Sequence, residues 1–108
     1  DARRGEGVSP VSVHAVLTPK PEHLAEVEAE LRTMARASRQ EEGNLRYDLA
    51  RERTESGVRL HISERYRDEA AVQAHRDSAH YQAYRAKAAA WLAEPPQVSV
   101  MEEVDVAG

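Results

Sequence analysis

The stretch that decides the fold runs from residue 44 to residue 66 and has the sequence NLRYDLARERTESGVRLHISERY. Apolar and polar residues alternate near both of its ends, which is the pattern of half-buried strands. The middle, Thr54-Glu55-Ser56-Gly57, has the composition of a tight turn. The stretch therefore predicts an antiparallel hairpin of two strands, Asn44–Arg51 and Val58–Tyr66. Alternation places Leu45, Tyr47 and Leu49 on one face of the first strand, and Leu60, Ile62, Glu64 and Tyr66 on one face of the second.

A strand and a helix are predicted before the hairpin. Residues 11–17 alternate around β-branched side chains, and a loop that contains Pro19 and Pro21 ends them. Within residues 22–40, apolar side chains recur at three- and four-residue steps, which predicts a helix with one buried face. Pro21 suits the opening turn of that helix, and Gly43 suits its C-terminal cap. The apolar stripe consists of Leu24, Val27, Leu31, Met34 and Ala35.

Two helices and a strand are predicted after the hairpin. Asp68 is a suitable N-cap for a short helix through His75. Either Asp77 or Ser78 can cap a second helix that runs to about Ala93. A final strand then follows, in which the alternating apolar residues are Val98, Val100, Val104 and Val106.

The predicted order of elements is β-α-β-β-α-β, which is the ferredoxin-like split arrangement of the α+β class. In this arrangement the helices cover one face of an antiparallel sheet, and the other face needs a cover. A second copy of the chain is the simplest cover, so we expect a homodimer that packs through its sheet faces. The domain is expected to span residues 11–106, and residues 1–10 are expected to be flexible or disordered.

The composition excludes several classes of protein. The 108 residues are 41% hydrophobic and 31% charged, and the formal charge is -4, without a basic block. Nucleic acid is therefore not an expected partner. No apolar run reaches the roughly 20 residues of a membrane helix, so no membrane partner is expected either. The chain has no Cys, which removes disulfides, thiolate zinc sites and iron–sulfur clusters. We expect a cytoplasmic protein.

Histidine residues are the main candidates for catalysis. His75 lies at the end of the short predicted helix and is expected to face the sheet, where it is either a base or a buried structural residue. His14 lies on the first predicted strand, where it faces either the pocket, as a second base, or the dimer interface. His80 begins the next helix, and a cap or dimer contact is the favoured interpretation. No His-x-His or His-Glu-x-x-His spacing occurs, so no metal site is expected.

An acidic residue and several aromatic residues complete the candidate site. Glu64 lies in an apolar row and needs a partner. An Arg partner is the preferred interpretation, and an imidazole, which Glu64 would orient, is the alternative. Four aromatic side chains either line a slot for a planar ring or form the core of a chain that lacks Phe. They are Tyr47, Tyr66, Tyr84 and Trp91.

Three stretches carry a resemblance to a known family. They are Glu42-Gly43-Asn44-Leu45-Arg46-Tyr47, Leu60-His61-Ile62-Ser63-Glu64-Arg65-Tyr66-Arg67-Asp68-Glu69-Ala70, and Ala74-His75-Arg76-Asp77-Ser78-Ala79-His80-Tyr81. With these stretches, residues 11–106 resemble the antibiotic-biosynthesis monooxygenase (ABM) domain. The resemblance implies a dimeric α+β barrel with a pocket between sheet and helices in each subunit. Some members are monooxygenases without a metal, flavin or haem prosthetic group, and other members degrade haem.

Two positions depart from the pattern of the haem-degrading members. Tyr66 stands where a Trp is usual, and His14 stands where an Asn is expected, whereas the Ala74-His75 pair is present. The resemblance therefore favours a cofactor-independent monooxygenase that acts with O2 on a small phenol, hydroquinone or polyketide-like ring. His75, His14 and Tyr66 are the candidate catalytic residues, and the candidate substrate-binding residues are Tyr47, Glu64, His80, Tyr84 and Trp91.

Two other functions stay open at this point. One is a dimeric module that binds a small ligand, or responds to stress, without catalysing a reaction. The other is a monooxygenase that binds and degrades haem. Because the family name predicts the fold better than the chemistry, the geometry of the site must decide among the three.

Overall fold

The structure is a computed structural model that describes residues 9–108. Most of the segment predicted to be flexible, residues 1–8 of 1–10, lies outside the described residues. Among the described residues, no helix has the length and apolar character needed to cross a membrane. The elements are β1 (Val11–Leu17), a 3-10 turn η2 (Pro21–His23), α1 (Leu24–Arg39), β2 (Asn44–Thr54), β3 (Gly57–Tyr66), α2 (Glu69–Asp77), α3 (Ala79–Ala88) and β4 (Gln97–Glu102).

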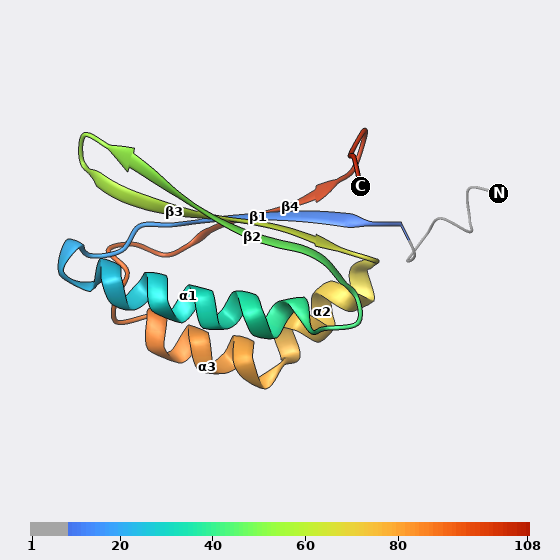
Figure 1. Ribbon diagram of the computed structural model, residues 1–108, viewed down its shortest axis with the longest axis horizontal. Helices are drawn as coiled ribbons and strands as arrows, with labels where there is room; N and C mark the ends of the chain where they lie inside the picture. The colour runs from blue at the N-terminus through green and yellow to red at the C-terminus, as the bar shows by residue number, and fades with distance from the viewer. Residues whose placement is uncertain (1–8) are drawn as a thin grey trace.

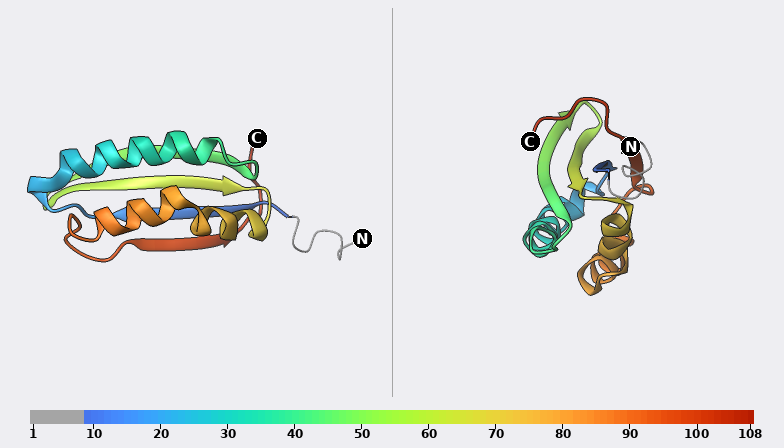
Figure 2. Two further views of the ribbon diagram at one scale, coloured as in Figure 1. Left: turned by 90° about the horizontal axis from the view of Figure 1, so that it is seen from below. Right: turned by 90° about the vertical axis from the view of Figure 1, so that its right-hand side faces the viewer.

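The four strands form one antiparallel sheet in the order β2-β3-β1-β4. The helices all lie on one side of this sheet (Figure 1). Figure 2 shows α1 along one half of the sheet and α2 with α3 along the other half. This arrangement confirms the predicted α+β ferredoxin-like fold, including the hairpin of β2 and β3.

Alternation along the strands separates the helix-facing side of the sheet from the open side. Val13 of β1 pairs with Glu64 of β3, and Tyr47 of β2 pairs with Glu64 from the other side. These three side chains are buried beneath the helices. The intervening residues of β1, such as His14, are half-buried on the open side. Glu64 therefore occupies the middle of the covered face.

The prediction that Leu45 shares a strand face with Tyr47 is wrong. The register of β2 against β3 shifts between Asn44 and Arg46, so Leu45 is an extra residue in a β-bulge. Its side chain is 51% exposed instead of buried beside Tyr47. An extra residue in one strand interrupts the alternation of side chains between the two faces of the sheet. Strict alternation counted from Asn44 therefore assigns Leu45 to the wrong face.

The last predicted helix and strand both end earlier in the structure. α3 ends at Ala88 and not near Ala93, because the residues that follow hydrogen-bond to the loop after β1. The N–H of Lys20 donates to the carbonyl of Trp91, and the N–H of Ala93 donates to that of Thr18. β4 ends at Glu102, beyond which Val104 is 95% exposed. The predicted strand residues Val104 and Val106 therefore lie outside the sheet.

Gly43 has a different role from the predicted helix cap. α1 already ends at Arg39, and the N–H of Gln40 closes the last turn. Gly43 does not have the positive φ that a C-terminal cap uses. Instead, a Cβ at this position would overlap the Cβ of Ala71 in α2. Glycine is required here because the loop after α1 packs directly against α2.

We predict that Gly43→Ala destabilises the protein by about 1–3 kcal/mol, because the new methyl group must push α2 away from the loop. Urea denaturation followed by circular dichroism measures this change. Ala71→Gly alone should lower the free energy of unfolding by about 1 kcal/mol, because glycine is unfavourable inside a helix. The double variant removes the overlap and should be more stable than the sum of the single effects implies. Strictly additive effects would contradict the proposed contact.

Candidate functional site

A cavity of about 360 Å³ lies between the sheet and helices α2 and α3. The sheet contributes its inner-face residues, and the helices contribute His75 and two tyrosines. Apolar and aromatic groups with a few polar ones are typical of sites for small molecules. The residues on which the chemistry depends are Tyr47, Glu64, His75, Arg76, Tyr81, Tyr84 and Arg85.

His75 is the polar side chain at the centre of this site. It comes from the last turn of α2 and is only 3% exposed. Its ring packs against Tyr66, with centroids 5.4 Å apart, and edge-on against Tyr81 at 5.0 Å. Its Nε2 atom lies 4.0 Å from Oε1 of Glu64. The fold therefore confines the imidazole between the aromatic rings and the cavity.

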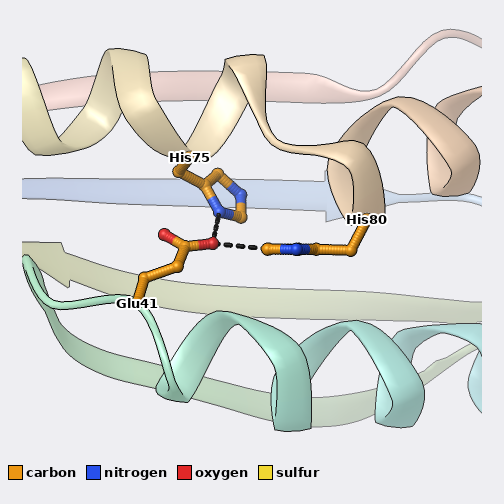
Figure 3. A group of neighbouring side chains, drawn as sticks. All are labelled: Glu41, His75 and His80. Atoms are coloured by element: carbon orange, nitrogen blue, oxygen red, sulfur yellow. Dashed lines mark hydrogen bonds and ion pairs between the residues drawn. The ribbon is translucent and has the colours of Figure 1, made fainter.

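Glu41 determines which nitrogen of His75 carries the proton. The carboxylate lies in the loop after α1, and its Oε2 atom is 2.8 Å from Nδ1 of His75 and 2.5 Å from Nε2 of His80 (Figure 3). Because a carboxylate oxygen can only accept, both nitrogens donate. Neutral His75 then has its proton on Nδ1, and its Nε2 is left free to accept a proton. Sequence reasoning missed Glu41, since a lone loop acid has no periodic or spacing signal.

Glu64 has a phenol as its partner and not the expected arginine. The hydroxyl of Tyr66 donates to Oε1 of Glu64 at 2.5 Å. No arginine of the described residues lies within ion-pair distance of Glu64, so the prediction of an Arg pair is wrong. The two side chains meet because residues two apart on a strand share a face. The alternative of a neighbouring imidazole agrees with the 4.0 Å approach of His75.

Burial shifts the pKa values of His75 and Glu64 in opposite directions. Loss of solvent raises the pKa of Glu64 to about 7, although the hydrogen bond from Tyr66 opposes this rise. Loss of solvent also lowers the pKa of His75 below 6.5, and the hydrogen bond to Glu41 offsets that only in part. Near neutral pH the site therefore contains a neutral base beside an acid that is partly protonated. Burial also raises the pKa of Tyr47, so its phenol stays neutral.

The aromatic candidates divide between the cavity and its surroundings. Tyr47 and Tyr84 line the cavity, as a binding role requires. Tyr66 is completely buried behind Glu64 and does not line the cavity. Trp91 lies outside the cavity and stacks on His23, with ring centroids 6.3 Å apart. The structure therefore separates Trp91 from the other candidates.

His14 lies on the opposite side of the sheet from the cavity. Its Nε2 atom is 3.0 Å from Nδ1 of His61, and the Nε2 atom of His61 is 2.8 Å from a carboxylate oxygen of Glu52. His14 therefore does not line the cavity, and its expected place at a dimer interface stays a prediction. His80 does not line the cavity either, but it contacts the site through Glu41.

Glu41, His75 and His80 could also hold a metal ion. One potential ligand atom from each residue lies within 4.8 Å of the others. Imidazole and carboxylate are ordinary ligands for zinc and related metals. The three residues come from a loop and two helices, so no sequence spacing shows them together. The expectation that the protein uses no metal stays a prediction.

Comparison with known proteins agrees with the fold. The family model described as antibiotic biosynthesis monooxygenase matches residues 10–87. Over 99 residues the chain is 37% identical to "Putative monooxygenase Rv0793" of Mycobacterium tuberculosis, an alignment that covers 92% of this chain and 96% of that protein. "Putative monooxygenase YcnE" of Bacillus subtilis is 34% identical over 88 residues, which are 82% and 92% of the two chains.

A solved structure extends this comparison to three dimensions. The structure of Rv0793 superposes with a TM-score of 0.85 and covers 93% of this chain and all of that one. A structure from Nitrosomonas europaea that is 23% identical has a TM-score of 0.84, which shows the same fold. The resemblance inferred from the three sequence stretches is thereby confirmed, and the chain belongs to the antibiotic biosynthesis monooxygenase family.

Proposed function

We propose that the protein is a cofactor-independent monooxygenase that acts on a small phenol, hydroquinone or polyketide-like ring. The observation that carries this proposal is the orientation of His75. Its Nδ1 donates to Glu41, and its free Nε2 is available to a group bound in the cavity. A neutral imidazole held in this way is suited to remove a phenolic proton.

In the proposed reaction, Nε2 of His75 removes a proton from the substrate hydroxyl. The electron-rich anion then reduces O2, a carbon–oxygen bond forms on the ring, and the oxygen–oxygen bond breaks. Hydroquinone and O2 are thereby converted, one molecule of each, into one hydroxyquinone and one water. One oxygen atom enters the ring, the other leaves as water, and the substrate supplies all four electrons. The reaction therefore needs no prosthetic group.

Glu64 and Tyr66 act together in this proposal. The hydroxyl of Tyr66 binds one oxygen of Glu64, so a proton on the other oxygen can be donated to an oxygen of the substrate. Tyr66 is thus a positioning residue rather than a direct ligand of the ring. Tyr47 and Tyr84 bound the space in which the ring would lie. Their apolar surfaces would also keep water from intercepting the oxygen adduct.

We also propose that the protein acts as a homodimer that packs through the open side of the sheet. All three helices lie on the other side, so in one chain this side has no helical cover (Figure 1). Val16 and the hydrogen-bonded pair of His14 and His61 lie there, half-buried in one chain. A second copy would complete the burial of these residues.

We predict that the purified protein consumes O2 with hydroquinone and transfers one atom from 18O2 into a hydroxyquinone. His75→Gln should lower kcat/KM by about 10²–10⁴-fold, which is the usual contribution of a general base. Oxygen-electrode and mass-spectrometric measurements check both effects. Dialysis against EDTA should leave the rate unchanged.

His23→Gln is the matched control, because His23 is a surface residue that pairs with Glu26. Loss of activity in His14→Gln but not in His75→Gln would transfer the role of base to His14. Ligand binding without O2 consumption would indicate a non-catalytic binding module. A Soret shift on titration with haem, together with haem breakdown, would support the haem-degrading alternative instead.

We predict a bell-shaped dependence of kcat/KM on pH. The acid limb reflects protonation of His75, whose pKa is lowered from its ordinary value by burial. The alkaline limb reflects loss of the proton from Glu64 near pH 7. Because the groups are 4.0 Å apart, the limbs describe the pair rather than the single residues. Glu64→Gln should remove the alkaline limb and retain the acid limb, and an unchanged alkaline limb would exclude Glu64 as the donor.

We predict that light scattering after size exclusion gives twice the mass of one chain. Val16→Arg should shift the protein toward monomer, because it places a charge in the proposed interface. Thr33→Arg on the exposed surface of α1 is the control and should leave the mass unchanged. A wild-type protein that remains monomeric at high concentration would disprove the proposed interface.

A further inference from the structure

Two arginines that form no direct ion pair with a described residue line the same cavity, although the charge of Arg76 acts on Glu64 at longer range. Arg76 comes from α2 and is half-buried, and Arg85 comes from α3 and is exposed. Within the described part of the chain, neither guanidinium forms an ion pair with a carboxylate. Other arginines do, for example Arg51 with Glu28 and Arg65 with Glu103. The two cavity arginines are therefore available to a ligand.

The side chains that line the cavity carry more positive than negative charge. Arg76 and Arg85 are both lining residues, whereas Glu64 is the one carboxylate among them. The whole chain, in contrast, has a formal charge of -4. A positive cleft with low-dielectric walls concentrates the field and attracts anions. The cavity wall is therefore the part of this acidic chain where an anion would find two cations.

The position of Arg85 also suits a planar ligand. The guanidinium carbon of Arg85 lies 6.0 Å from the centre of the Tyr81 ring, which itself lines the cavity. An aromatic surface and a cation are therefore adjacent at this part of the wall. A guanidinium presents a rigid fork of N–H donors that matches both oxygens of a carboxylate. One ring that carries a carboxylate would use both features together.

We propose that the substrate ring carries a carboxylate, which Arg76 and Arg85 bind while the phenolic oxygen faces His75. This proposal rests on the proposed function, since it assigns the substrate class of the same cavity. The arginines fix which way round the ring enters. The proposal also gives the two arginines a role that the base cannot have, because His75 must be uncharged before the reaction.

A matched pair of ligands tests the proposal: 2,5-dihydroxybenzoate and hydroquinone share a ring and differ in the carboxylate. Binding is measured by calorimetry without O2, so the result does not depend on catalysis. We expect the wild type to bind the carboxylate about tenfold or more tightly, a preference that falls as salt is added. Arg76→Gln and Arg85→Gln should each reduce the ratio of the two affinities by about fivefold or more.

Arg36→Gln is the control, because Arg36 also lacks a carboxylate partner but lies on α1, away from the cavity. It should leave the ratio unchanged. Arg76→Lys keeps the charge without the fork, should give an intermediate ratio, and serves if Arg76→Gln fails to fold. Equal affinities in the wild type, or a ratio that the arginine variants do not change, would overturn the proposal. Tight binding of the carboxylate without O2 uptake would support it while contradicting the monooxygenase assignment.

Discussion

The hydrogen bond between Glu41 and Nδ1 of His75 is the interaction on which the site depends. It assigns the proton to one nitrogen and leaves the other free at the cavity. The same carboxylate oxygen binds His80, so one acid connects the loop after α1 to both later helices. An imidazolium that forms during proton transfer would lie beside a negative charge, which compensates for its burial. Without Glu41, burial alone would make His75 a poor base.

The packing of Gly43 is what allows this hydrogen bond to form. Glu41 belongs to a loop, and loops are usually imprecise positions for functional groups. Here the loop is held against α2, because Gly43 contacts Ala71 directly and its carbonyl accepts from the N–H of Arg67. The contact brings the acid to the helix that carries His75. Gly43 thus helps to position Glu41 beside His75 although it bears no side chain.

Local patterns predicted the fold well, because alternation and capping depend on neighbouring residues. Asp68 caps α2 as expected from its position. The bulge at Leu45 was not predictable, since strand pairing decides it. The site was predicted less completely. His75 stood out as a histidine at a helix end, whereas Glu41 approaches it only through tertiary packing. Tyr66, the partner of Glu64, lies only two residues away in the sequence. The hydrogen bond between them was not predicted, because a carboxyl group and a phenol at this spacing are not a known sequence motif.

The opposite pKa shifts of His75 and Glu64 have one cause, which is burial. Burial disfavours the charged form of both groups, so near neutral pH the imidazole is neutral and the carboxyl group is partly protonated. Charge appears when a substrate ionises, and Glu41 then lies behind the protonated imidazole. The arginines at the wall would balance an anionic ligand without protonating the base. In the proposed reaction, a base, an acid and a cationic wall can share one small cavity because each would act on a different atom of the ring.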